Sequence, residues 1–179
     1  VVEHEDESRA NVASRPGTAS TVSFETKDEQ VLSGSYYQPK RRKGSAPAPA
    51  ALLLHDAGQS RSDLKDIATY LHKKGFAVLT VDLRGHGAST TIDMDFERSD
   101  DKGRSTLWGL STRDVDAAVG FLLDQEGVHA TNLSVIGVGA GASLAVRRAV
   151  DDENVCAVVL VEPNPNAFGY NLANGLADL

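Results

Sequence analysis

Few residues in this sequence could cross-link the chain or anchor it in a membrane. Cys156 is the only cysteine, so no disulfide can form within the chain. Its position inside the apolar run 155–161 predicts a thiol buried in the core. No stretch approaches the roughly 18 consecutive apolar residues of a transmembrane helix, and we therefore expect no membrane span. Because the sequence begins at Val1 without methionine, it fits both a cytoplasmic protein and an exported one whose signal segment has been removed.

Basic residues are also scarce. The 18 lysines and arginines are outnumbered by 25 aspartates and glutamates, which gives a formal net charge of -7. A nucleic-acid surface requires clustered basic side chains, so we expect no nucleic-acid partner. The basic cluster 40–43 precedes a proline-rich stretch and predicts a solvated loop. The histidines and the cysteine lack the spacing of metal ligands, and we expect no metal.

The length of 179 residues and the hydrophobic content of 41% predict one domain with one core. Residues 1–20 are polar and charged and predict a loosely held tail, which leaves 21–179 as the domain. Alternating strand and helix patterns predict an α/β fold with a mainly parallel sheet, helices on both faces and an amino-terminal hairpin. The expected strands are 21–26, 31–37, 50–54, 76–81, 132–137 and 155–161, and the expected helices are 62–74 (capped by Ser62), 111–123 and 140–150.

Residues 137–141 have the glycine spacing of a nucleophile elbow but no serine. In a G-x-S-x-G elbow, a sharp strand-to-helix turn exposes a serine hydroxyl for attack. Here Gly137 and Gly141 keep the outer positions and Gly139 stands at the centre, between an expected strand and an expected helix. Since glycine has no side chain, the pattern indicates a hydrolase scaffold without its nucleophile.

Two further loops have the order and spacing found in a hydrolase. Residues 55–58, His-Asp-Ala-Gly, follow an expected strand and resemble an H-G-x-G oxyanion loop. Residues 82–89 resemble the D-x-R-G-x-G-x-S loop after the next strand. Together with the elbow, these motifs make residues 21–170 similar to the α/β-hydrolase superfamily. The resemblance implies an α/β-hydrolase-like core.

The groups that catalyse hydrolysis in this superfamily are missing from the matching positions. Active members carry serine where Gly139 stands, an acid after the seventh strand and a histidine after the eighth. The sequence stops at Leu179, just past the sixth expected strand, and every histidine precedes the elbow: His4, His55, His72, His86 and His129. We therefore expect no catalytic residue and infer a degenerate hydrolase, without a cofactor, that serves as a binding or interaction module. The alternative is a serine-type ester or amide hydrolase whose missing groups lie outside this chain.

A narrower resemblance also implies an inactive scaffold. The N-myc downstream-regulated family, regarded as non-catalytic α/β-hydrolase folds, carries an H-D-x-G loop, a G-V-G-A-G-A elbow and a P-N-A-x-G segment. Residues 55–58, 137–142 and 165–169 are similar to these motifs. The loop 84–87 instead resembles that of an ordinary hydrolase. The likeness supports inactivity and does not assign the chain to that family.

A scaffold of this kind is expected to keep part of its oxyanion hole. The amides of Ala57 and Ala140 should meet at a helix amino terminus, beside His55 and Gly58. Backbone N–H groups in this arrangement suit a carboxylate or phosphate. A small anionic ligand is therefore expected there.

The remaining polar residues near these loops predict structural roles. Asp82 and Arg84 are expected to pin their loop by charge-assisted hydrogen bonds, and the imidazole of His86 is expected to bond to nearby backbone. Ser60 and Ser143 lie near the oxyanion loop and the elbow. Neither serine has a motif that would activate its hydroxyl.

The same glycines also fit a different class of protein. Gly137, Gly139 and Ala142 follow a strand and open a helix, and Glu162 lies about twenty residues later at the end of the next strand. This is the pattern of a Rossmann dinucleotide site, in which the acid binds the ribose of a nicotinamide or flavin dinucleotide. Such a fingerprint normally lies in the first βαβ unit, whereas several elements precede it here.

The last expected strand, 155–161, has the composition of an interior strand although nothing is predicted to follow it in the sheet. An apolar edge of this kind invites pairing with another strand. We expect it to be covered by residues 163–179, by a second copy of the chain or by a separate protein.

Overall fold

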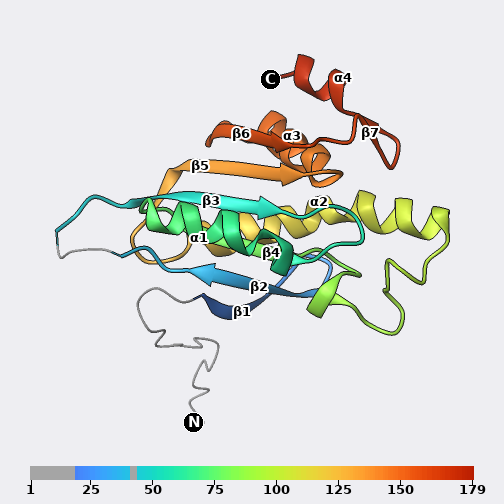
Figure 1. The fold of residues 1–179 in the computed structure, drawn as a ribbon, viewed down its shortest axis with the longest axis horizontal. Helices are drawn as coiled ribbons and strands as arrows, with labels where there is room; N and C mark the ends of the chain where they lie inside the picture. Colours follow the sequence, from blue (N-terminus) through green and yellow to red (C-terminus); the bar gives the residue numbers. More distant parts are fainter. Residues whose placement is uncertain (1–18, 41–43) are drawn as a thin grey trace, which may run out of the picture.

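The computed structural model describes residues 19–40 and 44–179, which form a six-stranded sheet flanked by helices (Figure 1). The strand order is β1-β2-β4-β3-β5-β6. β2 pairs antiparallel with β1 and with β4, whereas β3, β4, β5 and β6 pair in parallel. This confirms the expected α/β fold with an amino-terminal hairpin. The strands are β1 (Ser20–Glu25), β2 (Val31–Tyr37), β3 (Ala48–Leu54), β4 (Ala77–Asp82), β5 (Val128–Val138) and β6 (Val155–Val161).

The central strands are buried because helices cover both faces of the sheet. Along β3, Leu52 packs into one core cluster and Leu53 into the other, as the alternation of side chains along a strand requires. The first cluster is closed by α2 (Asp101–Leu123) and α3 (Gly141–Asp151), and the second by α1 (Lys65–Lys73). Burial on both faces explains the unbroken apolar runs in the sequence.

α2 is longer than predicted and begins at Asp101 rather than at Ser111. Asp100 caps it, because its side chain accepts a hydrogen bond from the amide of Gly103 at 2.7 Å. Residues 101–106 carry no apolar side chain and most of them are exposed, so the first turns of the helix show no apolar stripe. Periodicity therefore does not reveal this part of the helix.

The first helical segment begins earlier than predicted as well. Ser60, not Ser62, is its cap, and the amide of Ser60 donates to Asp63 Oδ2 at 2.9 Å. A 3-10 turn, Arg61–Leu64, then leads into α1. Most of the expected tail 1–20, and residues 41–43 of the expected basic loop, lie outside the described residues, while Ser20 already belongs to β1. Within the described part of the chain, no helix is both long enough and apolar enough to cross a bilayer.

Residues 163–179 do not cover β6. They form β7 (Asn166–Ala167), β8 (Tyr170–Asn171) and α4 (Leu172–Ala177), and α4 packs against α3 (Figure 1). In the described sheet, β6 pairs with β5 alone. Of the three alternatives expected to cover the strand, residues 163–179 are therefore wrong, whereas a second copy or a separate protein stays a prediction.

Cys156 is exposed, so the expectation of a core thiol is wrong as well. The composition of β6 is that of an interior strand, but its position at the end of the sheet leaves several of its side chains open to solvent. Val159 of the same strand is 46% exposed. Sequence composition alone does not distinguish an edge strand of this type from a central one.

Candidate functional site

The elbow joins the end of β5 to the start of α3 through Gly139. This residue has a φ of 54°, in the left-handed region that glycine adopts most readily. The flanking glycines allow backbones to approach: an added Cβ at Gly137 would lie 2.4 Å from the carbonyl oxygen of Gly141. One added at Gly141 would lie 2.6 Å from the carbonyl oxygen of His55. These glycines thus build the tight strand-to-helix turn of a hydrolase elbow.

The carboxylate of Asp56 fills the space beside Gly139. Its Oδ1 accepts one hydrogen bond from the amide of Ala57 at 2.8 Å and another from the amide of Ala140 at 2.7 Å. A Cβ on residue 139 would lie only 2.1 Å from Asp56 Cγ. Asp56 in this position and a side chain at position 139 therefore exclude each other.

The two amides belong to the segments that form an oxyanion hole in a hydrolase. One lies in the loop after β3 and the other at the start of α3, and both point to a single oxygen. In a hydrolase that oxygen would belong to the tetrahedral intermediate. Here it belongs to Asp56, so the position expected to bind an external anion is occupied by the chain itself.

Sequence analysis missed the role of Asp56, although a signal was present. The His55 loop has aspartate where the H-G-x-G motif has glycine, and the elbow has Gly139 where the motif has serine. Each departure alone is unremarkable in a degenerate motif. The structure shows that they are complementary, because the side chain gained at position 56 occupies the space left at position 139.

His55 lies in the same loop. Its imidazole is neutral, and both of its ring nitrogens are hydrogen-bonded. Its Nδ1 donates to the carbonyl oxygen of Asp56 at 2.7 Å, and its Nε2 accepts from the amide of Leu83 at 3.1 Å. Burial lowers the pKa of His55 to about 4. His55 therefore has no free nitrogen with which to transfer a proton. Gly58, with a φ of 76°, makes the turn that follows.

Asp82 fixes the loop after β4. Its Oδ1 accepts from the amide of Arg61 at 2.7 Å. Its Oδ2 accepts from Arg61 Nη1 at 3.0 Å and from the amide of Ala88 at 2.9 Å. Asp82 thus ties the first helical turn to the loop 82–89.

Arg84 anchors the same loop inside the protein. It is 1% exposed, and its guanidinium bonds to Asp114 of α2 at 2.7 and 2.8 Å and to Asp28 of the β1–β2 turn at 2.9 and 3.1 Å. Burial opposes the charge, but these hydrogen bonds outweigh it and raise the pKa of Arg84 above its ordinary value. The hydrogen bond from Arg84 also lowers the pKa of Asp28. One buried network therefore joins the hairpin, the loop and α2.

The two serines near the elbow and the oxyanion loop lack the partner that activates a nucleophile. Ser143 is 1% exposed, accepts a hydrogen bond from Trp108 Nε1 at 3.2 Å and donates to the carbonyl oxygen of Ala140 at 2.8 Å. The hydroxyl of Ser60 donates to Asp63 Oδ2 at 3.2 Å. A serine nucleophile is typically activated by an adjacent histidine, and neither hydroxyl bonds to a histidine among the described residues.

The turn is poorly suited to a dinucleotide. A pyrophosphate would need the free N–H groups at the start of α3, but the Ala140 amide already donates to Asp56. The Gly139 amide donates to the carbonyl oxygen of Val161 at 3.0 Å. Glu162, the expected ribose ligand, directly follows Val161 and has a φ of 46°. The geometry therefore argues against the dinucleotide interpretation.

The family model described as serine aminopeptidase, S33, matches residues 45–173, which is most of the chain. The chain belongs to the serine aminopeptidase S33 family. Membership confirms the α/β-hydrolase superfamily that the three motifs predicted. The family match covers the oxyanion loop, the loop after β4 and the elbow.

Curated relatives are longer than this chain. An uncharacterized protein of Mycobacterium tuberculosis is 33% identical over 129 residues, which cover 72% of this chain and 40% of that protein. The esterase FrsA of Yersinia pestis is 31% identical over 150 residues, which cover 83% of this chain and 32% of that protein. The chain thus spans less than half the length of these relatives.

Solved structures share the fold of this S33-family chain. The esterase Pf2001 of Pyrococcus furiosus matches with a TM-score of 0.63 at 24% identity, over 81% of this chain and 52% of that chain. The α/β hydrolase GrgF of Penicillium sp. sh18 matches with a TM-score of 0.63 at 23% identity, over 81% of this chain and 46% of that chain. At this identity the likeness shows the fold alone, and the side chains at the elbow must decide the chemistry.

The contact between Asp56 and position 139 predicts strong coupling in the free energy of unfolding. Gly139→Ala should destabilise the protein by about 2–5 kcal/mol, because the new Cβ adds a clash with Asp56 to the strain of a positive φ. In an Asp56→Ala background the same substitution should cost only the φ strain, about 1–2 kcal/mol. Urea unfolding of the wild type, both single variants and the double variant measures the coupling.

Asp56→Asn provides the matched control. Asparagine has the size of aspartate and keeps an acceptor oxygen, so Gly139→Ala should remain as costly in this background as in the wild type. If Gly139→Ala alone fails to fold, recovery of a folded protein with Asp56→Ala reports the same coupling. Equal costs in the wild-type and Asp56→Ala backgrounds would contradict the steric account.

Proposed function

We propose that this chain is a catalytically silent member of the S33 family and works as a binding or interaction module. One observation supports this most directly: Asp56 Oδ1 accepts both amides that would stabilise an oxyanion, while Gly139 stands in place of the nucleophile. Hydrolysis by this fold needs a hydroxyl at the elbow and a free oxyanion hole beside it. Neither is present in the described part of the chain.

The electrostatics of the elbow favour the internal carboxylate over a substrate. Asp56 lies at the amino end of α3, where N–H groups and the helix dipole stabilise a negative charge. Hydrogen bonds to an ionised acceptor contribute about 1.5–3 kcal/mol each. A neutral substrate carbonyl would have to displace a charged group that is already bonded to both donors.

The elbow offers no hydroxyl on which the histidines of the two loops could act as a general base. Both ring nitrogens of His55 are bonded to backbone groups. The Nδ1 of His86 donates to the carbonyl oxygen of Arg84 at 3.0 Å. Because no serine occupies the elbow, a base at this position would have no proton to accept from it.

The resemblance to the N-myc downstream-regulated family supports the same proposal. That family combines an H-D-x-G loop with an elbow that lacks serine, as this chain does at residues 55–58 and 137–142. The contact between Asp56 and position 139 supplies a physical reason for the combination, since the two side chains would compete for one space. The esterase activity named for FrsA and Pf2001 is therefore not proposed for this chain.

A fluorophosphonate probe tests the proposal, because it forms a covalent adduct only with an activated serine. Intact-mass spectrometry should show no adduct on this protein, while a serine esterase treated in parallel becomes labelled. An adduct that disappears in Ser143→Ala or in Ser60→Ala would reveal a substitute nucleophile and contradict the proposal.

We further propose that the outer side of β6 is the interaction surface. Val161 packs in the core cluster under α1, and the strand alternation places Ala157 and Val159 on the same face. Ala157 is exposed and Val159 is 46% exposed, so α1 does not cover them. The backbone groups on the outer edge of β6 have no strand partner in the described sheet.

The occupant that fits this surface is a further parallel strand followed by a helix. The strand would bond to the free edge of β6, and its helix would cover Ala157 and Val159, repeating the arrangement of the preceding units. The matched relatives are more than twice as long as the portion this chain covers.

Substitution of Val159 tests whether this surface mediates protein association. When that strand and helix are absent, the uncovered edge of β6 should pair with a second copy of the chain. Val159→Lys should shift the protein toward monomer, because a lysine on an edge strand blocks pairing and association. Val150→Lys is the matched control, since Val150 of α3 is 41% exposed but lies outside the sheet. Analytical ultracentrifugation distinguishes the three proteins. A monomeric wild type, or equal effects of the two substitutions, would contradict the proposal.

A further inference from the structure

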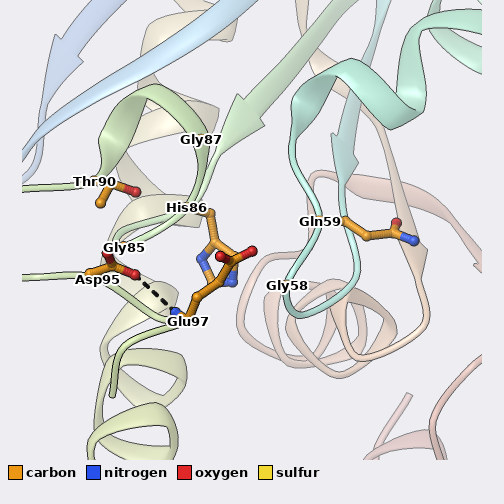
Figure 2. A pocket seen from close by; sticks show the side chains of 8 residues that line it. All are labelled: Gly58, Gln59, Gly85, His86, Gly87, Thr90, Asp95 and Glu97. Carbon is orange, nitrogen blue, oxygen red and sulfur yellow. Dashed lines mark hydrogen bonds between the residues drawn. The ribbon is translucent and has the colours of Figure 1, made fainter.

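A second site lies between the oxyanion loop and the loop after β4. It is a cavity of about 270 Å³, lined by Gly58 and Gln59 on one side and by Gly85, His86, Asp95 and Glu97 on the other. Figure 2 shows the imidazole of His86 between the segment 95–97 and the loop that carries Gly58. This volume is below that of a typical drug-binding pocket, so the site suits a small ligand.

His86 presents a buried hydrogen-bond acceptor with no partner among the described residues. Its Nδ1 lies 3.0 Å from the carbonyl oxygen of Arg84, which can only accept, so Nδ1 carries the proton and Nε2 is left as the acceptor. His86 is 4% exposed, and Nε2 is buried without a hydrogen bond. Burial lowers the pKa of His86, which keeps the ring neutral and Nε2 unprotonated at neutral pH. A buried acceptor without a donor calls for a ligand or an ordered water.

The charged side chains that line the cavity are the carboxylates of Asp95 and Glu97. Glu97 is exposed, and its side chain forms no hydrogen bond or ion pair with any described residue. Asp95 is partly neutralised, because its carboxylate accepts two backbone amides and pairs with Arg98 at 3.3 Å. The segment 93–101 contains five carboxylates and only one basic residue, Arg98. Arg104 bonds to the carbonyl oxygens of Phe96 and Glu97 but is not among the lining residues. The charged side chains that line the cavity are acidic and favour a cation over an anion.

We propose that this cavity binds a small primary ammonium ligand, which donates an N–H to His86 Nε2 and is neutralised by the carboxylate of Glu97. An ammonium group carries three donors and no acceptor, which matches the acceptor His86 Nε2 and the carboxylate of Glu97. A carboxylate ligand would meet the charge of Glu97 and find no basic side chain among the lining residues. The inference concerns a different cavity from the Asp56 contact and does not depend on loss of catalysis.

Benzylammonium is a suitable probe, with benzyl alcohol and benzoate as its neutral and anionic counterparts. In the isotope-labelled protein, benzylammonium should shift the NMR resonance of His86 Nε2 in a saturable way, because that nitrogen gains a hydrogen bond. Benzoate should leave the resonance unchanged, and benzyl alcohol should bind more weakly than benzylammonium.

Glu97→Gln separates a specific contact from general attraction to an acidic protein. It should raise the dissociation constant for benzylammonium about threefold, the effect of losing one exposed ion pair. Glu153→Gln removes the same charge from an exposed position outside the cavity and should leave the constant unchanged. An unshifted His86 Nε2 at saturating benzylammonium, binding of benzoate as tight as that of benzylammonium, or equal effects of the two substitutions would overturn the proposal.

Discussion

The paired hydrogen bonds from the amides of Ala57 and Ala140 to Asp56 are the interaction on which the elbow depends. Two N–H groups that converge at a helix amino terminus require a hydrogen-bond acceptor, and they stabilise a negatively charged oxygen most strongly. In a hydrolase, that requirement is met transiently by the substrate in the transition state. In this chain a permanent carboxylate meets it, and the space beside it stays open only because residue 139 is glycine. The same geometry that favours catalysis in other members therefore stabilises the resting fold here.

Buried charges elsewhere hold the loops that frame this contact. Arg84 joins the β1–β2 turn to α2 through Asp28 and Asp114, and Asp82 ties the loop after β4 to the first helical turn. A buried ion pair adds little net stability, but loss of one partner leaves an uncompensated charge, so such networks fix the position of the loops that they join. The contact between Asp82 and Arg61 thereby holds the loops after β3 and β4 together, and the cavity at His86 lies between these two loops.

Much of this architecture could be predicted from local patterns, because those patterns reflect local physics. The continuous apolar strands, the glycine-rich turn after β5 and the missing serine are all visible without coordinates. The start of α2 could not be predicted in this way, because its polar first turns follow no apolar periodicity. The exposure of Cys156 depends on strand order, which the composition of β6 does not encode. The role of Asp56 depends on a contact across 84 residues of sequence, and only the fold brings that side chain to Ala140.

A high-resolution crystal structure of this chain at neutral pH tests the central claim most directly. The density should place one oxygen of the Asp56 carboxylate within hydrogen-bonding distance of both the Ala57 and the Ala140 amides, with no water between these donors. A carboxylate turned out to solvent, with water or a buffer anion held by the two amides, would show that the oxyanion hole is open and would contradict the account.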